Sequence, residues 1–180
     1  MTNLTPLTVT VQLTLRDIYR ANVAITLGRR SPLKWMLYFL VQSAWGSVAF
    51  FALFSALNGH KASWIALIWG PLFFTAFAPY LFYGAPYIAA RALVRKNPNA
   101  SKTAQWHFFS DRIEAKGPVS DTVLQWSAFV RIRETKEQFL LYMQEQFANV
   151  LPKRSFATVS EIEAFRELIR SSYMGETFLL

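Results

Sequence analysis

Two long stretches without a charged side chain dominate this sequence, residues 35–59 and residues 62–90. The hydrocarbon core of a membrane is about 30 Å thick, so a helix needs roughly 20 apolar residues to cross it. Both stretches exceed that length and are rich in Leu, Phe, Ala, Val and Trp, and only a short link separates them. The pattern predicts a transmembrane helical hairpin with spans at about 35–57 and 64–90.

The formal net charge of +8 is distributed unevenly along the chain. Residues 1–110 hold ten Lys or Arg and one acidic residue, whereas residues 111–180 hold nine basic and ten acidic residues. The positive excess therefore flanks the apolar stretches, which is typical of a membrane protein and does not indicate a nucleic-acid partner. Because Lys61 is the single Lys or Arg between the two spans, the positive-inside rule predicts a multi-pass protein with both termini in the cytoplasm.

The two predicted spans differ in character. The first contains small residues at four-residue spacing, a pattern that permits close packing within the hairpin or between two copies. These pairs are Ser43 with Ser47 and Ala52 with Ala56. The second span contains Pro71, Pro79 and Pro86, which predict a kinked helix. No acidic, amide or basic side chain lies beside these prolines, so a channel or transporter is the weakest of the possible functions.

The N-terminal part, residues 1–32, predicts a strand followed by a juxtamembrane amphipathic helix. Apolar and polar residues alternate over Leu7–Leu15, which is typical of a half-buried strand. Thr14 stands three residues before Asp17, the spacing of a capping box, and a helix is expected over residues 15–27. The strand is expected to pair with the C-terminal sheet.

Residues 97–180, after the hairpin at residues 33–96, predict a separate soluble domain. Short runs of alternating residues indicate strands at 103–109, 112–116, 122–126, 129–135, 138–143 and 147–151. A final helix is expected over residues 160–172, with Ser160 as its N-cap and Glu163 three residues later. The chain is therefore expected to be an α+β membrane protein whose soluble part is a compact antiparallel β-barrel or sandwich closed by a C-terminal helix.

Several short motifs in this region carry a resemblance to a known family. They are Phe-Ser-Asp-Arg-Ile at 109–113, Gln-Trp-Ser at 125–127, Val-Arg-Ile-Arg-Glu-Thr at 130–135, Phe-Leu-Leu-Tyr at 139–142 and Leu-Pro-Lys-Arg-Ser-Phe at 151–156. With the preceding hairpin, this order resembles the YcxB-like family of bacterial membrane proteins. The resemblance implies a location in the bacterial inner membrane and a pleckstrin-homology-like barrel for the C-terminal domain. It implies no enzymatic activity.

Basic residues near predicted strand ends are the candidates for contacting a ligand or a lipid headgroup. They are Arg131, Arg133, Lys136, Lys153 and Arg154. Near an anionic membrane surface each such charge contributes about 1 kcal/mol to binding. Acidic neighbours such as Glu134 and Glu137 leave open the alternative of an ordinary solvated face. Three further residues are expected to be structural anchors, namely Trp126, Pro152 and Phe156.

Catalytic and metal-binding patterns are absent from the sequence. The two histidines, His60 and His107, have no partners at metal-ligand spacing, and no phosphate-binding glycine loop or nucleophile elbow occurs. The chain has no cysteine, which excludes disulfides and cysteine metal sites. We therefore expect a protein that is not an enzyme and that needs no cofactor.

Two functions from different classes fit these observations. The first is a membrane-tethered cytoplasmic binding or regulatory module that recognises a protein segment or an anionic lipid headgroup. The second is a structural or assembly subunit, with an immunity-related or stress-related role, that packs within a larger membrane complex. The expected partners are the lipid bilayer and either another protein or further copies of this chain.

Overall fold

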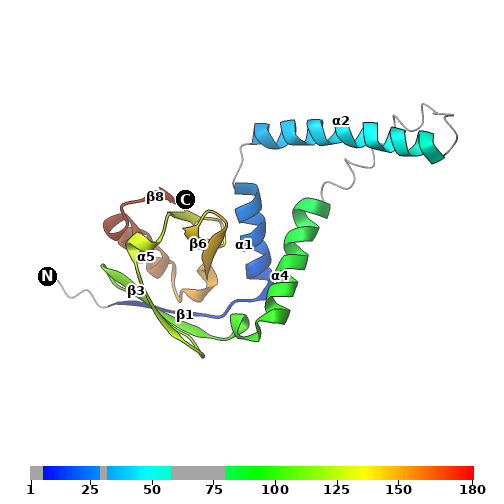
Figure 1. Ribbon diagram of the computed structural model, residues 1–180. Helices are drawn as coiled ribbons and strands as arrows, with labels where there is room; N and C mark the ends of the chain where they lie inside the picture. The colour runs from blue at the N-terminus through cyan, green and yellow to red at the C-terminus, as the bar shows by residue number, and fades with distance from the viewer. Residues whose placement is uncertain (1–5, 29–31, 58–79) are drawn as a thin grey trace. The chain divides into compact units, whose positions relative to one another are not determined.

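The computed structural model of the protein describes residues 6–28, 32–57 and 80–180. It contains two compact units, which are Met1–Ala24 together with Ala89–Leu180, and Ile25–Ile88. We call the first unit the β domain, because it contains all the described strands. The β domain is thus assembled from two parts of the chain that flank the second unit in sequence (Figure 1).

The first sheet of the β domain is an antiparallel meander in the order β1-β2-β3-β4. Its strands are β1 (Leu7–Val11), β2 (Ala104–Phe108), β3 (Arg112–Lys116) and β4 (Asp121–Gln125). β1 pairs with β2 along its whole length, from Leu7 opposite Phe108 to Val11 opposite Ala104. The expected pairing of the N-terminal strand with the later sheet is therefore confirmed.

Helix α1 (Leu15–Gly28) begins where the sequence predicts it. The Asp17 backbone N–H donates to Thr14 Oγ1 (3.3 Å), and the Thr14 backbone N–H donates to Asp17 Oδ2 (2.8 Å). These reciprocal bonds form a capping box, which satisfies donors that a helix start leaves free. Because Thr14 belongs to this cap, the preceding strand ends at Val11 and not at Leu15 as predicted.

The second sheet has the order β7-β6-β5-β8. Its strands are β5 (Arg131–Glu134), β6 (Gln138–Gln144), β7 (Phe147–Pro152) and β8 (Glu176–Phe178). The neighbours β5, β6 and β7 are antiparallel, whereas β8 runs parallel to β5. The α+β class is confirmed, but the described strands hydrogen-bond as two four-stranded sheets and not as one closed barrel. The sequence did not predict β8.

Helix α5 (Val159–Ser172) follows the second sheet, and its cap differs from the predicted one. Thr158 Oγ1 accepts the Glu161 backbone N–H (3.2 Å), and Glu161 Oε2 accepts the Ala157 backbone N–H (2.8 Å). The prediction of Ser160 as the N-cap was wrong. The Thr-Val-Ser-Glu pattern two residues earlier starts the helix at Val159, with Thr158 as its N-cap and the Glu161 carboxylate bonded to the residue before that cap.

The core of the β domain is an aromatic cluster in which α5 meets both sheets. Phe165 on α5 lies 4.7 Å from Phe108 of β2 and 4.9 Å from Phe139 of β6, measured between ring centroids. Both ring pairs are edge-on, the geometry that aromatic pairs prefer, and all three side chains are buried. The two sheets and the helix therefore share one core.

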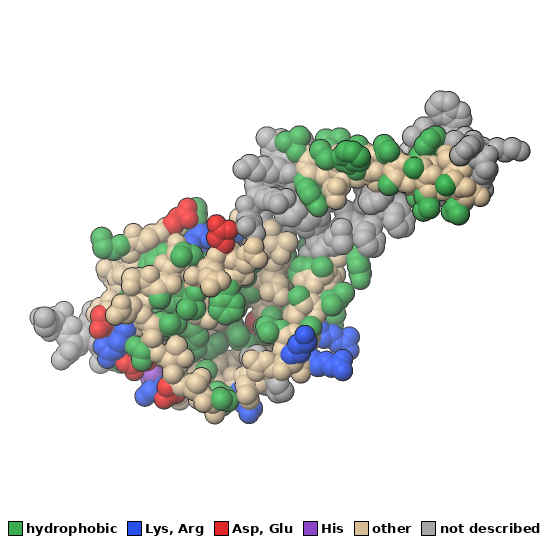
Figure 2. All heavy atoms as spheres, viewed as in Figure 1, with side chains coloured by type: hydrophobic (Ala, Val, Ile, Leu, Met, Phe, Trp, Pro, Cys, Tyr) green, Lys and Arg blue, Asp and Glu red, His purple; other side chains and the backbone are tan. Residues whose placement is uncertain are grey.

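The second unit contains helix α2 (Pro32–Leu57), which agrees with the first predicted span. Its stretch Leu40–Leu57 is long and apolar enough to cross a membrane, and 6% of it is buried inside the protein, unlike the core helix of a soluble domain. Hydrophobic side chains cover its described surface (Figure 2). Among the described residues this is the single candidate span.

Most of the second predicted span, residues 64–79, lies outside the described residues. Its described end is helical, with a π-helical turn η1 (Tyr80–Gly84) followed by α4 (Ala85–Lys96). Pro86 lies just after the π-helical turn, inside a helix that is continuous from Tyr80 to Lys96, so its missing N–H removes a helical hydrogen bond. The two-span hairpin and its multi-pass topology therefore stay predictions.

Candidate functional site

Lys153, one of the predicted ligand-contacting residues, neutralises a buried carboxylate. It lies in the short 3-10 helix η4 (Lys153–Ser155) that follows β7, and its Nζ is 2.5 Å from Glu134 Oε1. The Lys153 side chain is 16% exposed and the Glu134 side chain is fully buried. Its ammonium group therefore has an internal partner.

Glu134 is the centre of a larger charged cluster that the sequence did not reveal. The Arg166 guanidinium on α5 contacts the same carboxylate, with Nη2 2.5 Å from Oε1, and the Leu180 backbone N–H donates to Oε2 (2.9 Å). Burial raises the pKa of Glu134, but the bonds from Arg166, Lys153 and the Leu180 N–H outweigh it and hold this pKa below its ordinary value. We call Glu134, Lys153, Arg166 and the Leu180 amide the Glu134 cluster.

Arg154 connects η4 to the start of α1. Its Nη2 lies 2.5 Å from Asp17 Oδ2 and donates to the Gln12 carbonyl (2.7 Å). Burial raises the pKa of Asp17, but hydrogen bonds from Arg154 and Thr14 lower it below its ordinary value. Arg154 therefore ties the strand-to-helix junction of the N-terminal segment to the second sheet.

The remaining three predicted basic residues form no ion pair with Glu134 or Asp17, the partners of Lys153 and Arg154. The Arg131 guanidinium stacks on the Tyr142 ring at 4.2 Å from its centroid, and Arg133 Nη1 donates weakly to the Ala24 carbonyl (3.4 Å). Lys136 is exposed in the turn between β5 and β6 and makes no ion pair with any residue that the structure describes. Four of the five predicted residues thus contact different internal partners, and the role of all five in ligand contact stays a prediction.

The three predicted anchors are buried in the β domain. Trp126 is 3% exposed and donates its indole N–H to the Phe109 carbonyl (2.9 Å) from the 3-10 turn η3 (Trp126–Ala128). Pro152 is the last residue of β7, and Phe156 packs on Phe165 with ring centroids 5.5 Å apart.

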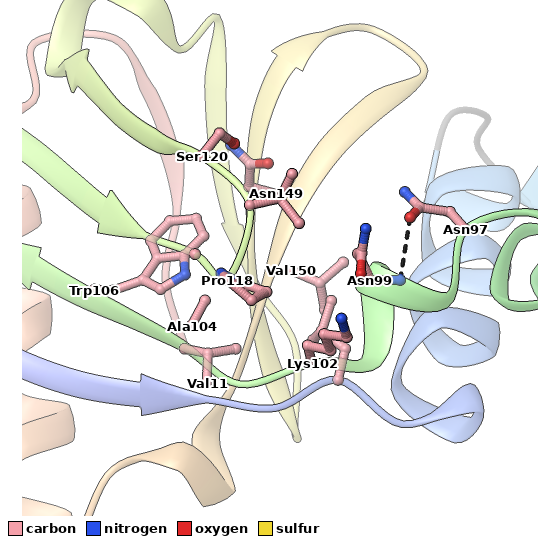
Figure 3. A pocket seen from close by; sticks show the side chains of 13 residues that line it. Val11, Asn97, Asn99, Lys102, Ala104, Trp106, Pro118, Ser120, Asn149 and Val150 are labelled. Atoms are coloured by element: carbon pink, nitrogen blue, oxygen red, sulfur yellow. Dashed lines mark hydrogen bonds between the residues drawn. The ribbon is translucent and has the colours of Figure 1, made fainter.

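A pocket of about 270 Å³ lies at the ends of β1 and β2, where the chain leaves the first sheet and returns to it (Figure 3). Its lining comes from β1, the 3-10 helix η2 (Pro98–Ser101), β2, the β3–β4 turn and β7. The lining residues are Val11, Leu13, Asn97, Asn99, Lys102, Ala104, Trp106, Gly117, Pro118, Val119, Ser120, Asn149 and Val150. Sequence reasoning missed this pocket, because it took residues 97–101 only as a domain boundary.

The chemistry of the pocket is amphipathic. Trp106, Pro118 and Val150 form its apolar part, while Asn97 and Asn99 lie on the side of η2 (Figure 3). The Asn97 side chain accepts the Asn99 backbone N–H (3.2 Å), which fixes that turn. No acidic residue belongs to the lining, and Lys102 is its one cation.

Lys102 is available to a ligand. Its side chain is exposed, and it forms no ion pair within the described parts of the chain. A single free ammonium group with amide and hydroxyl neighbours suits a ligand that has one anionic group and further hydrogen-bonding groups. No cluster of three potential metal ligands occurs in residues 6–28, 32–57 and 80–180.

Comparison with known proteins supports the family resemblance over part of the chain. The model of the YcxB-like protein family matches residues 108–169, which run from the end of β2 into α5. The match includes Glu134, Lys153 and Arg166. The pocket-lining residues of η2 and β2 all lie before the matched range. Neither the curated proteins nor the solved structures contain a match.

Proposed function

We propose that the protein is a membrane-attached binding module whose pocket at the ends of β1 and β2 recognises an anionic lipid headgroup. The observation that carries this proposal is the insertion of an apolar helix between two paired strands. Val11 of β1 and Ala104 of β2 are opposite each other, whereas α2 lies between them in the sequence. Through α1 and α4, these two adjacent strands would therefore attach the β domain to the membrane. The same strand ends line the pocket.

Exposed basic residues on α4 support this proposal. Arg91 and Arg95 are four residues apart, which puts them on one face of the helix, and Lys96 follows. None of the three forms an ion pair with a described residue, so their charges are free to attract an anionic leaflet by about 1 kcal/mol each. The charge pattern of the sequence makes the cytoplasmic leaflet of a bacterial inner membrane the proposed location.

Attachment also explains why a pocket with one cation is sufficient. A tethered domain meets headgroups at a high effective concentration, so the intrinsic affinity of its pocket need not be high. We further propose that the two sheets and α5 correspond to the pleckstrin-homology-like domain that the family resemblance implies.

The headgroup proposal predicts selective binding of anionic lipid by the full chain. In zwitterionic detergent micelles, soluble dihexanoyl-phosphatidylglycerol is expected to bind, and dihexanoyl-phosphatidylcholine is not. Lys102→Ala is expected to weaken the phosphatidylglycerol affinity about fivefold, since one such charge contributes about 1 kcal/mol. Isothermal titration calorimetry measures both affinities.

Lys136→Ala is the matched control, because Lys136 is also an exposed lysine but does not line this pocket. It is expected to leave the phosphatidylglycerol affinity unchanged. An equal loss of phosphatidylglycerol affinity in both variants would show that the pocket is not the headgroup site. Equal affinity of the unaltered chain for the two lipids would reject headgroup recognition altogether.

A second candidate function, a structural or assembly subunit, is favoured by the surface of α2. Ser43 and Ser47 lie on one helix face, and the Ser47 hydroxyl donates to the Ser43 carbonyl (2.6 Å), which leaves a small surface for another helix. This function predicts a stable assembly of the full chain in native mass spectrometry from mild detergent. Ser47→Leu is expected to dissociate it, while Val48→Leu on another face is not. A monomer of the unaltered chain, with no companion protein, would reject this candidate.

A further inference from the structure

β8 is the least secured strand of the β domain. It has three residues, all exposed, and it forms the single parallel pair among the described strands. Parallel pairing is slightly less stable per residue than antiparallel pairing. β8 lies against the edge of β5 that β6 leaves free, with Arg131 opposite Glu176 and Arg133 opposite Phe178.

Two further contacts hold the segment that contains β8. Leu179 packs against the hydrophobic core, and the Leu180 backbone N–H donates to the buried Glu134 carboxylate (2.9 Å). The edge of β5 therefore offers backbone groups to an extended chain, together with an apolar contact and a buried acceptor. These are the elements of β-strand addition, in which backbone hydrogen bonds give affinity and side-chain sites give specificity.

The end of α5 is fixed by contacts that do not involve residues 176–180. Tyr173 is 7% exposed, and its hydroxyl donates to the Phe129 carbonyl (3.1 Å), so it fixes the helix end. Met174 is fully exposed. Gly175 then separates this fixed end from β8. The attachment of α5 thus does not depend on β8.

The edge of β5 also contains a polar group that β8 does not use. Arg131 Nε is buried and has no hydrogen-bond partner. Glu176 lies opposite Arg131 in the register, yet the two form no ion pair. A buried donor without a partner costs free energy, so a ligand that satisfied it would gain affinity over the chain's own segment.

We propose that the free edge of β5 is a binding site for an extended segment of a partner protein, and that residues 176–180 occupy it until the partner displaces them. The fitting partner segment has a hydrogen-bond acceptor that reaches Arg131 Nε, which Glu176 does not, and an apolar residue at the place of Leu179. This site is separate from the headgroup pocket and does not depend on it.

A peptide with the sequence of residues 173–180, labelled at its N-terminus, tests this site by fluorescence anisotropy. In detergent micelles, a chain that ends at Gly175 is expected to bind the peptide at least about tenfold more tightly than the intact chain, because the intact chain's own segment competes at high effective concentration. The Glu176→Gln peptide is the matched control and is expected to bind the shortened chain as tightly as the unaltered peptide, because Glu176 forms no ion pair with Arg131. The Thr177→Pro peptide, which lacks a backbone donor, is expected to bind most weakly.

The proposal would be overturned if the Thr177→Pro peptide bound the shortened chain as tightly as the unaltered peptide does. It would also be overturned if no peptide bound to a shortened chain whose near-ultraviolet circular dichroism spectrum is intact. If the shortened chain does not fold, hydrogen exchange of the intact chain decides. The amides of residues 176–180 are expected to exchange through local opening at least about tenfold faster than those of β6, and equal protection would overturn the proposal. Dimers of the intact chain that disappear on shortening would assign the edge to a second copy and not to a different partner.

Discussion

Replacing Phe165 by alanine is expected to lower the free energy of unfolding of the β domain by about 3–5 kcal/mol. Phe165 is fully buried, and its ring contacts Phe108 from the first sheet and Phe139 from the second. The substitution leaves a cavity at the point where α5 and both sheets meet, and the surrounding rings relax into it only partly. Urea unfolding of the full chain in detergent, followed by near-ultraviolet circular dichroism, measures the change.

Val159→Ala is the matched control for this experiment, because Val159 is on the same helix and is 75% exposed. Surface substitutions of this kind change stability by less than about 0.5 kcal/mol. A loss below about 1 kcal/mol in Phe165→Ala would show that α5 is not the element that joins the two sheets.

Local signals in the sequence predicted much of this fold. The alternation over 112–116 gives β3 with the same bounds, and the Thr14–Asp17 spacing gives the start of α1. Each of these depends on residues within a few positions of one another, so sequence alone contains the information. The Ser160 cap failed because two Ser/Thr-x-x-Glu patterns overlap there, and their spacing alone does not show which one begins the helix.

β8 could not be predicted, because its position depends on distant contacts. Three residues are too few to show a period, and the pairing with β5 joins segments far apart in the chain. The cost of closing such a loop is recovered only when the two segments share a core. Leu179 and the Leu180 amide make those contacts in the folded domain alone.

Contacts between distant parts of the chain also explain why the sequence did not identify the partners of Lys153 and Arg154. The sequence shows that Lys153 and Arg154 are basic, but not that Glu134 and Asp17 neutralise them. Asp17 and Arg154 are 137 positions apart, so no spacing rule joins them. Free cations such as Lys102 are recognised only once the partners of the other basic residues are known. This is why the five basic residues indicated by the sequence did not include Lys102, which lines the pocket beside β1 and β2.

Replacing Glu134 by glutamine is expected to destabilise the β domain by about 3–5 kcal/mol, because it leaves Lys153 without its counter-charge and leaves Arg166 with Glu163 alone. The Lys153 and Arg166 side chains are each 16% exposed, so water cannot fully replace the lost carboxylate. Glu167→Gln is the matched control. Its side chain is 70% exposed and pairs with Arg170 on the surface, where such a pair contributes about 0–1 kcal/mol. Equal losses in the two variants would show that the Glu134 cluster does not stabilise the fold.

The acid limb of the stability curve provides the second readout of this substitution. The pKa of Glu134 is below its ordinary value of 4.5, so the folded protein binds fewer protons at this group than the unfolded chain. Its stabilisation is therefore complete above about pH 5 and is lost as the pH falls through the lowered folded pKa. The glutamine of the Glu134→Gln variant does not titrate, so the free energy of unfolding of this variant is expected to fall less steeply below about pH 5. Asp17 is responsible for part of the remaining slope. Urea unfolding at a series of pH values measures both slopes, and parallel acid limbs would contradict the assignment of this titration to Glu134.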